Sequence, residues 1–440
     1  MWLERLAPVI AINWGETLQP QKYFGSNMNS SSNNFTTSIR WLFAVAIVSM
    51  IASGSTQAQT IAYTDVTIET IGEDGRLENA TMVVTDDKIT EVGTDVEIPD
   101  DARVVSMSGK TIMPGIVDPY HVYKSSSTSN TRTVVFRGRT FTLPGGGPFS
   151  AGAFIRVGEY FDPFNLNFNP AKRTGITTAN LVTDGRGLSS FANLTEEITA
   201  DMLFKKSGLM FAKVTNQTSA LDVIRKPLEP PKTKPKTTKK TTSSDDKEKK
   251  LSPAEEVKKL WSDVQKGESP IFVNVNNEAA VAYLLQFVKK NEKIKLILVA
   301  TGPNLYQSLD EIKKNKNVTV VLQPGIDRKP FSADLMNVSQ MLAEQEIPFC
   351  ISMSLSKSQL SASQDDPMFP VAMLVKTGLD RDIALKSITM KPAELMGIEE
   401  THGSLEKDKH ANFLVFDGDP LKTGSRLQQV FLNGKKIHEN

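Results

Sequence analysis

The feature of this sequence that most constrains its fold is an alternation of short apolar runs with amphipathic stretches in its middle. Four runs have the length and composition of buried strands: IFVNV (271–275), KLILVA (295–300), VTVVL (318–322) and IPFCIS (347–352). The segments between them repeat apolar residues at helical spacing over about 10–14 residues. Strands that recur after each helix predict parallel βαβ units, because parallel neighbours need a crossover connection.

The two ends of the chain have a β pattern without helices. Residues 60–115 contain short β segments separated by turn residues such as Asp86 and Asp87. Near the C-terminus, Asn433-Gly434 is a strong signal for a two-residue hairpin. Residues 175–182 (GITTANLV) predict one more strand, ahead of the alternating region.

This order of elements predicts a (β/α)8 TIM-like barrel over residues 116–395. A small β-sandwich, formed jointly by residues 60–115 and 396–440, would flank it. A doubly wound parallel sheet is the alternative. Residues 226–250 interrupt the pattern with nine lysines, four acidic residues and one hydrophobic residue, so they predict a disordered Lys-rich surface insertion.

The N-terminus has the pattern of an export signal. Residues 41–52 are uncharged and apolar, and small residues follow up to Ala58. A membrane-spanning helix needs about 20 apolar residues, so this shorter run predicts a signal peptide over residues 1–58. Residues 1–27 would then be an over-extended start; an uncleaved anchor is the alternative. We expect an exported protein, periplasmic or secreted, with no stable membrane span after cleavage.

Composition excludes several classes of function. The chain has 51 Lys and Arg against 50 Asp and Glu, so no strong field would attract nucleic acid, and we expect no nucleic-acid partner. A single cysteine, Cys350, excludes an intramolecular disulfide, a Cys-rich zinc site and an iron–sulfur cluster. The sequence contains four histidines, and three of them lie in its last forty residues. A cluster of histidine ligands is therefore difficult to assemble.

Several segments resemble signatures of the amidohydrolase superfamily. They are KTIMPGIVD (110–118), GITT (175–178), TMKPAELMG (389–397) and HGSLEKDKHANFLVFDGDP (402–420). The subgroup that the sequence resembles best is the exported, imidazolonepropionase-like amidohydrolases. The resemblance implies a barrel that holds one or two divalent metals, usually zinc, at the C-terminal ends of its strands. There a metal-bound water hydrolyses non-peptide C–N bonds.

The metal ligands that the resemblance implies are largely missing. Strand 1 should read D-x-H-x-H, but the two histidine positions hold Tyr120 and Val122 after Asp118. His121 lies between them, where an extended strand would turn it to the opposite face unless a one-residue bulge intervened. Strand 5 carries Asn274 where a histidine should be.

The remaining ligands cannot be supplied from elsewhere in the sequence. No histidine lies between His121 and His402 for strand 6, and no acidic residue between 350 and 364 provides the strand-8 aspartate. We expect the three C-terminal histidines, His402, His410 and His438, to be exposed on the surface. No metal ligand is assigned, and no cofactor is expected.

Two hypotheses follow from these residues. In the first, the chain is a non-catalytic binding or partner subunit with an amidohydrolase fold, and its partner is an active amidohydrolase paralogue or a small-molecule ligand. In the second, it is an active amidohydrolase with a rebuilt or metal-independent site. The candidate pocket in both consists of Asp118, Tyr120, His121 and Asn274. The sequence alone leaves open whether the protein is an enzyme.

Overall fold

The computed structural model describes most of the chain after the predicted signal peptide. The described residues are 59–123, 131–136, 139–144, 154–164, 171, 173–195, 202–214, 218–228, 252–301, 304–355 and 366–440. The chain divides into two compact units, Met1–Gln57 and Ala58–Asn440, and all described residues belong to the second. Among them, no helix has the length and apolarity that crossing a bilayer requires. The signal peptide predicted over residues 1–58 lies outside the described residues.

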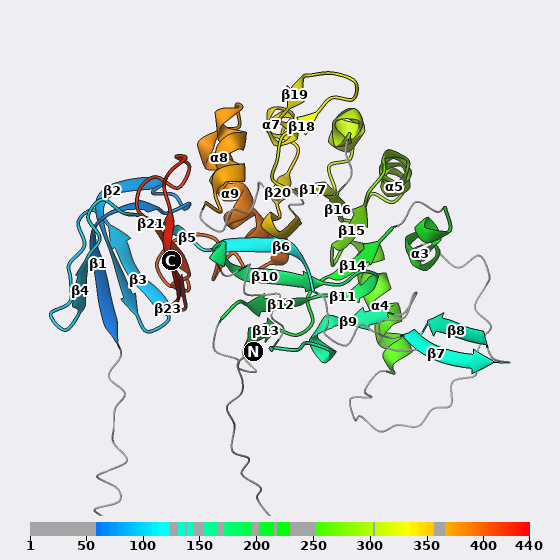
Figure 1. Ribbon diagram of the computed structural model, residues 1–440, viewed down its shortest axis with the longest axis horizontal. Helices are drawn as coiled ribbons and strands as arrows, with labels where there is room; N and C mark the ends of the chain where they lie inside the picture. The colour runs from blue at the N-terminus through cyan, green and yellow to red at the C-terminus, as the bar shows by residue number, and fades with distance from the viewer. Residues whose placement is uncertain are drawn as a thin grey trace, which may run out of the picture. The chain divides into compact units, whose positions relative to one another are not determined.

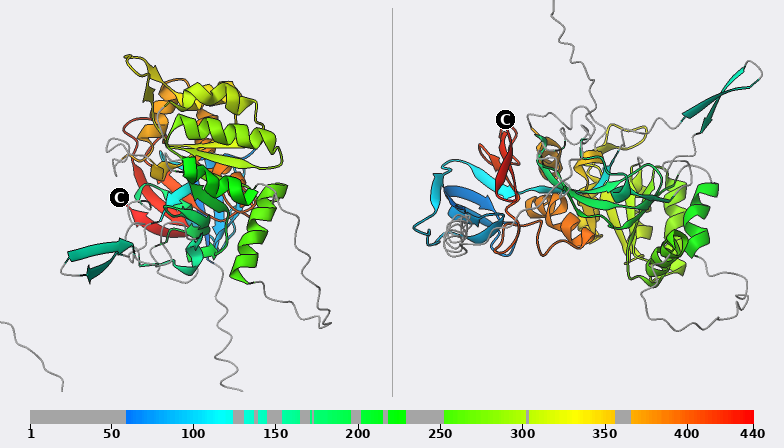
Figure 2. Two further views of the ribbon diagram at one scale, coloured as in Figure 1. Left: turned by 90° about the vertical axis from the view of Figure 1, so that its right-hand side faces the viewer. Right: turned by 90° about the horizontal axis from the view of Figure 1, so that it is seen from below.

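Both ends of the described chain join in one β domain, which lies to one side of the helices in Figures 1 and 2. Its continuous sheet has the order β23 (Lys435–Glu439), β22 (Leu427–Leu432), β21 (Phe413–Phe416), β5 (Thr111–Pro114), β1 (Thr60–Glu69), β2 (Arg76–Thr85) and β3 (Lys88–Gly93), and β4 (Arg103–Ser106) also pairs with β1. The joint domain of both ends is therefore present. Its strands belong to a single hydrogen-bonded sheet, not to the two sheets that a sandwich implies.

The core of the β domain is aromatic. Phe413 and Phe431 stack with ring centroids 4.3 Å apart, and Tyr63 meets Phe413 edge-on at 5.3 Å. The predicted hairpin turn is confirmed, because Asn433 and Gly434 both have positive φ, as a two-residue turn of this kind requires.

The parallel βαβ units of the middle region are confirmed. Five neighbouring parallel strands follow one another in chain order: β14 (Met210–Lys213), β15 (Ile271–Val275), β16 (Leu296–Ala300), β17 (Val318–Leu322) and β20 (Phe349–Ile351). Their crossovers and the helices after them are α3 (Thr218–Leu228), α4 (Pro253–Lys266), α5 (Glu278–Lys290), α6 (Leu309–Lys313), α7 (Val338–Glu344), α8 (Phe369–Lys376), α9 (Arg381–Ile388) and α10 (Met390–Met396). The first three residues of the predicted Lys-rich insertion, 226–228, belong to α3. Residues 229–250 lie outside the described part.

The first strands of the predicted barrel form a separate sheet. Its order is β13 (Leu203–Lys205), β12 (Ser190–Asn193), β10 (Ile176–Val182) and β6 (Ile116–Val122). β10 pairs with β6 on one edge and with the antiparallel strand β12 on the other, so neither edge is left for the next parallel strand. For this reason the described strands do not form the closed (β/α)8 ring that the sequence predicts.

Six further short strands lie within residues 116–395, the span of the predicted barrel. They are β7 (Thr131–Phe136), β8 (Arg139–Pro144), β9 (Phe154–Arg156), β11 (Arg186–Leu188), β18 (Asp327–Arg328) and β19 (Leu335–Met336). β11 extends the seven-stranded sheet by pairing with β14 and β9. Gly187 permits this contact, because a Cβ at its position would lie 1.9 Å from the Ile155 carbonyl oxygen.

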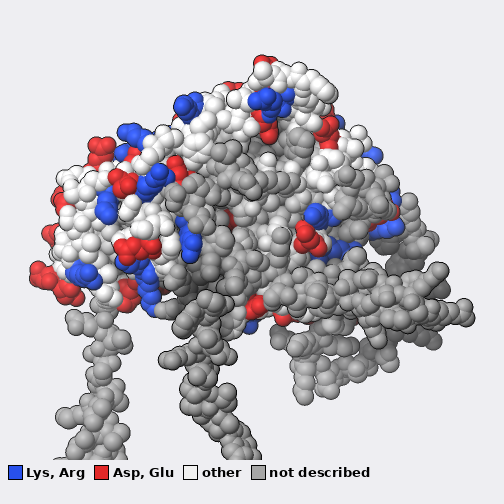
Figure 3. Space-filling model, viewed as in Figure 1, with Lys and Arg blue, Asp and Glu red and all other residues white. Residues whose placement is uncertain are grey.

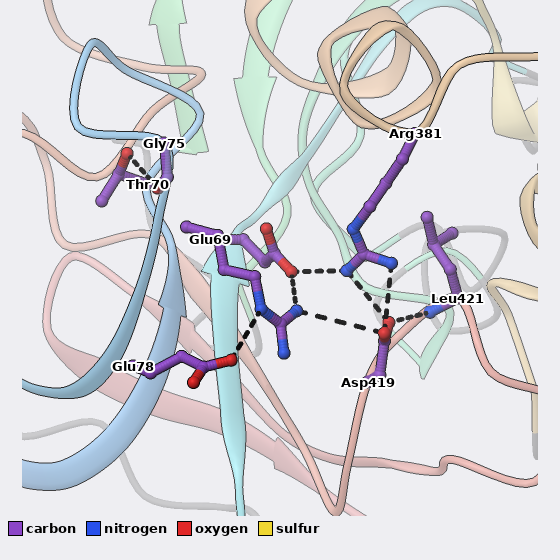
Figure 4. A network of polar contacts seen from close by, with 8 residues as sticks. Glu69, Thr70, Gly75, Glu78, Arg381, Asp419 and Leu421 are labelled. Carbon is purple, nitrogen blue, oxygen red and sulfur yellow. Dashed lines mark hydrogen bonds and ion pairs between the residues drawn. The ribbon is translucent and has the colours of Figure 1, made fainter.

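A network of ion pairs and hydrogen bonds connects the β domain with helix α9 (Figure 4). The Arg381 guanidinium on α9 donates to both oxygens of Asp419, at 3.0 and 3.1 Å, and to Glu69 Oε1 at 2.5 Å. Arg76 donates to the same Glu69 oxygen. Glu69 is the last residue of β1 and is buried. Arg381 therefore holds together segments from the beginning and the end of the described chain.

We predict that Arg381→Met lowers the free energy of unfolding by about 2–4 kcal/mol, because it removes one of the two cations that compensate the buried Glu69 carboxylate. Urea unfolding at neutral pH measures this loss. The control Lys376→Met changes an exposed lysine at the end of α8 and should stay within about 0.5 kcal/mol of wild type. Equal stability of the two variants would contradict a role for Arg381 in joining the segments.

Candidate functional site

The site predicted from sequence is centred on Asp118, a completely buried carboxylate on β6. Ser352 Oγ donates a 2.5 Å hydrogen bond to Asp118 Oδ1, and His121 Nδ1 lies 3.3 Å from Asp118 Oδ2. Ser352 follows β20 directly, and its hydroxyl also lies 3.3 Å from the Tyr120 carbonyl oxygen. Side chains thus connect β6, at the edge of one sheet, with the end of β20, at the edge of the other.

The Asp118 carboxyl is ionised in this environment. Burial by itself raises its pKa, but the hydrogen bond and charge of His121 and the hydrogen bond from Ser352 outweigh burial, so that the pKa is lowered. An ionised carboxylate only accepts hydrogen bonds, so the His121 Nδ1 that faces it carries the proton. The pair is therefore a carboxylate that orients an imidazole.

A β-bulge turns His121 toward Asp118. In the pairing of β6 with β10, Asp118 is opposite Ala179 and His121 is opposite Leu181. Three steps along β6 thus match two steps along β10, so β6 contains one extra residue here. In a regular strand His121 would face away from Asp118; the bulge that the sequence left as an alternative is present.

Tyr120 and Asn274 form the second half of the site. The Tyr120 side chain is buried, its ring centroid lies 6.1 Å from that of Phe272, and its hydroxyl is hydrogen-bonded with the Asn274 side chain. Burial is the main reason that the pKa of Tyr120 is raised. Asn274 Oδ1 also accepts a 3.3 Å hydrogen bond from Thr301 Oγ1. The structure therefore brings all four predicted site residues together, in two bonded pairs.

Sequence reasoning missed Ser352 and Ser354. The resemblance implies an acidic ligand after IPFCIS, and a hydroxyl group there carries no such signal. Ser354 is exposed. Its Oγ donates to the Tyr120 carbonyl oxygen at 3.2 Å, and its side chain also hydrogen-bonds Asp118. The signal that could have identified them is a pair of serines, two residues apart, at the C-terminal end of β20, where functional side chains of a barrel are expected.

The residues of this site do not fit a zinc centre. Asp118 accepts hydrogen bonds from Ser352 and from His121 Nδ1, and the Tyr120 hydroxyl is hydrogen-bonded with Asn274, so these groups already serve one another. Among the described residues, no group of three or more His, Cys, Asp or Glu side chains could hold a metal ion. Zinc sites in proteins use three or four such ligands.

The expectation of a surface position is wrong for His402. This side chain is 5% exposed, its ring stacks on Phe204 at 5.4 Å, and its Nδ1 lies 2.8 Å from Thr401 Oγ1. Burial, followed by the neighbouring His410, lowers the pKa of His402 to about 3. His410 is half-buried, with its Nδ1 3.2 Å from Asp87 Oδ2.

His438 is also only partly exposed, and its Nε2 lies 2.8 Å from Asn440 Oδ1. In sequence, it and the other two C-terminal histidines lie beyond α10, the last described helix.

Comparisons with known proteins agree with the fold. No protein-family profile matches the sequence, and no curated protein matches it. Among solved structures, an amidohydrolase from Thermotoga maritima MSB8 is similar at 16% identity with a TM-score of 0.62, over 86% of this chain and 100% of that one. At this level of identity the similarity concerns the fold alone.

Two further solved structures are similar to a lesser degree. A β-aspartyl dipeptidase from Fervidobacterium islandicum AW-1, in complex with a β-Asp-Leu dipeptide, matches at 14% identity with a TM-score of 0.52, over 87% of this chain and 97% of that one. A prolidase complexed with N-methylphosphonate-L-proline matches at 13% identity with a TM-score of 0.51, over 87% and 100%. The chain thus has a mixed α/β fold similar to that of these three proteins, and its described strands do not form a closed ring.

We predict that Ser352→Ala lowers the free energy of unfolding by about 1–3 kcal/mol at pH 7, because it removes a hydrogen bond from a buried, ionised carboxylate. Ser354→Ala is the matched control and should cost less, since the hydroxyl of this exposed residue is replaced by water. Urea unfolding of both variants measures the difference. A Ser352→Ala protein as stable as wild type would show that Asp118 does not depend on this donor.

A second prediction concerns acid stability. The folded-state pKa of His402 lies near 3, below its ordinary value near 6.5, so between these values the unfolded chain binds more protons. Its contribution is fully present above pH 6.5 and is lost as the pH falls toward 3. His402→Phe should therefore reduce the loss of unfolding free energy between pH 7.5 and pH 5 by about 2 kcal/mol.

The matched control for this prediction is Phe204→Leu, which removes the stacked ring but keeps His402. It should lower stability at every pH and leave the slope of stability against pH as in wild type. Urea unfolding at several pH values gives that slope. If His402→Phe had the wild-type slope, the buried imidazole would not be the group that titrates.

Proposed function

We propose that this chain is an amidohydrolase-superfamily protein that does not carry out metal-dependent hydrolysis and acts as a non-catalytic binding or partner protein. The signatures at residues 110–118, 389–397 and 402–420 support the superfamily, as does the fold. Within it, the imidazolonepropionase-like subgroup and export after removal of residues 1–58 are parts of the same proposal. A small-molecule ligand or an active amidohydrolase paralogue would be its partner.

The observation that carries the proposal is the mutual satisfaction of the polar groups at the positions of the expected ligands. Tyr120 and Asn274 replace two histidines and bond each other. Ser352 stands after the strand where an aspartate is expected, and it donates to Asp118. Without zinc, a bound water is not acidified from a pKa of 15.7 toward about 7, and one imidazole does not replace that effect.

A binding role is compatible with a well-formed framework. The strands that surround the site are buried, and their polar side chains hold one another in fixed positions. Such a framework can hold binding loops at the C-terminal ends of the strands even if the site between those strands catalyses no reaction.

The Asp118–His121 pair favours a second candidate, a hydrolase with a rebuilt, metal-independent site. A carboxylate that orients an imidazole is the arrangement of a general base, and Ser354 offers a hydroxyl beside it. In this candidate His121 would take a proton from water or from the serine. The two candidates differ in one measurable way, namely whether hydrolysis occurs and depends on Asp118.

We predict that tag-free protein, purified and then equilibrated with zinc, retains less than about 0.1 zinc per chain after brief dialysis, because a zinc site needs about three protein ligands and this one offers a single histidine. Elemental analysis by mass spectrometry measures this content. His121→Ala is the matched variant and should give the same value. One or two zinc ions per chain that resist chelation, and that His121→Ala releases, would overturn the proposal.

The same preparations separate the two candidates by activity. β-Aspartyl dipeptides and prolyl dipeptides, substrates suggested by the structural neighbours, should be hydrolysed no faster than in buffer. Hydrolysis that survives chelation and is abolished in Asp118→Asn would instead establish the metal-independent enzyme.

A further inference from the structure

A cavity of about 430 Å³ lies at the opposite end of the strands from Asp118. It is bounded by the start of β20, by α7, and by α9 and α10, and Thr319 near the start of β17 also lines it. Asp118 meets the other end of β20 through Ser352. The volume falls within the range of small-molecule sites, about 300–1,000 Å³.

The wall of this cavity is mostly apolar. Its apolar lining consists of Ala343, Ile347, Pro348, Phe349, Ile383 and Leu395. Ile383 is 39% exposed, although it is a large aliphatic side chain on a helix. Cys350 also lines the cavity; it is buried, and burial raises the pKa of its thiol, so that it stays neutral.

The cavity is lined by two lysines and one glutamate, so its positive charges outnumber its negative ones. Lys391 and Glu394 neutralise each other, with Nζ and Oε2 2.7 Å apart. Lys386 is half-buried on α9, and within the described part of the chain it forms no ion pair. The cavity therefore presents an apolar wall and one uncompensated ammonium group.

A second hollow beside the cavity is also lined by more basic than acidic side chains. Its volume is about 720 Å³, and it shares Thr319, Glu394 and Leu395 with the first. Four lysines line it, against three glutamates: Lys205, Lys293, Lys295 and Lys316. Elsewhere, on the face drawn in Figure 3, described acidic and basic residues are interspersed. Together the two neighbouring hollows are lined by more basic than acidic side chains, which favours an anion there.

We infer that the cavity bounded by β20, α7, α9 and α10 is a binding site for a small amphipathic carboxylate, with its apolar body against Ile347 and Phe349 and its carboxylate at Lys386. A phosphate-type dianion would need more donors than one ammonium group. A cation would meet Lys386 unfavourably, and a metal ion would find only a neutral thiol and a glutamate already paired with lysine. The inference does not depend on the proposed function, because the two sites lie at opposite ends of β20.

Octanoate tests the inference, because it combines an eight-carbon apolar chain with one carboxylate. Isothermal titration of the full-length protein as purified should show one octanoate bound per chain with a Kd below about 1 mM. Lys386→Met should weaken binding about tenfold, as expected for loss of a charge-assisted contact. Ala343→Phe, which fills the cavity from α7, should abolish binding, while Lys376→Met should bind like wild type.

Thermal unfolding and circular dichroism show whether each variant is folded, and Lys386→Met changes a partly exposed side chain that no described ion pair holds. Octylammonium, the cation of the same length, should bind at least about tenfold more weakly than octanoate. The inference is overturned if octanoate does not bind at millimolar concentration, if octylammonium binds equally well, or if Lys386→Met and Ala343→Phe leave the affinity unchanged. Zinc content and hydrolysis at the Asp118 site do not enter any of these readouts, so the two proposals can fail independently.

Discussion

The hydrogen bond from Ser352 to Asp118 is the interaction on which the arrangement of the candidate site depends. β6 and β20 lie at the edges of two different sheets, and no backbone ladder joins them. The Ser352 hydroxyl connects them through the Asp118 carboxylate and the Tyr120 carbonyl oxygen. Because this contact is fully buried, the charge of Asp118 must be compensated there, and the compensation also holds the two edges together.

Charge compensation explains why the departures from the amidohydrolase pattern occur together. The resemblance implies a metal ion surrounded by histidines and carboxylates. In this chain a hydroxyl and an imidazole compensate the one remaining carboxylate, while Tyr120 and Asn274 use each other. Restoring one histidine would therefore remove a partner from an existing pair without completing a ligand set. The site is a coupled group of residues, and a single position does not define it.

Local patterns predicted the elements that depend on neighbours in sequence. The parallel βαβ units follow from apolar runs such as 271–275 and 318–322, and the hairpin follows from Asn433-Gly434. The proximity of Asp118 and Tyr120 follows from their spacing on one strand, and the resemblance to the strand signatures adds His121 and Asn274 to the candidate pocket.

Features that depend on distant pairing were not predictable in this way. The bulge before His121 is set by the register between β6 and β10, and the open ring arises because β12 occupies the second edge of β10. His402 was expected on the surface because its burial requires Phe204, which is remote in sequence. Ser352 was overlooked because a hydroxyl carries no ligand signal until its partner is known.

The two ends of the strands differ in how far their polar groups are satisfied, and this difference bears on where the protein would bind. The Asp118 carboxylate already accepts hydrogen bonds from Ser352 and His121, so a ligand that binds this carboxylate would have to replace them. At the other end, an apolar wall and the uncompensated Lys386 leave a cavity whose polar group gains a partner when an anion enters. A ligand could therefore be selected at the second end without any chemistry at the first, because selection needs only a shaped cavity and one well-placed charge.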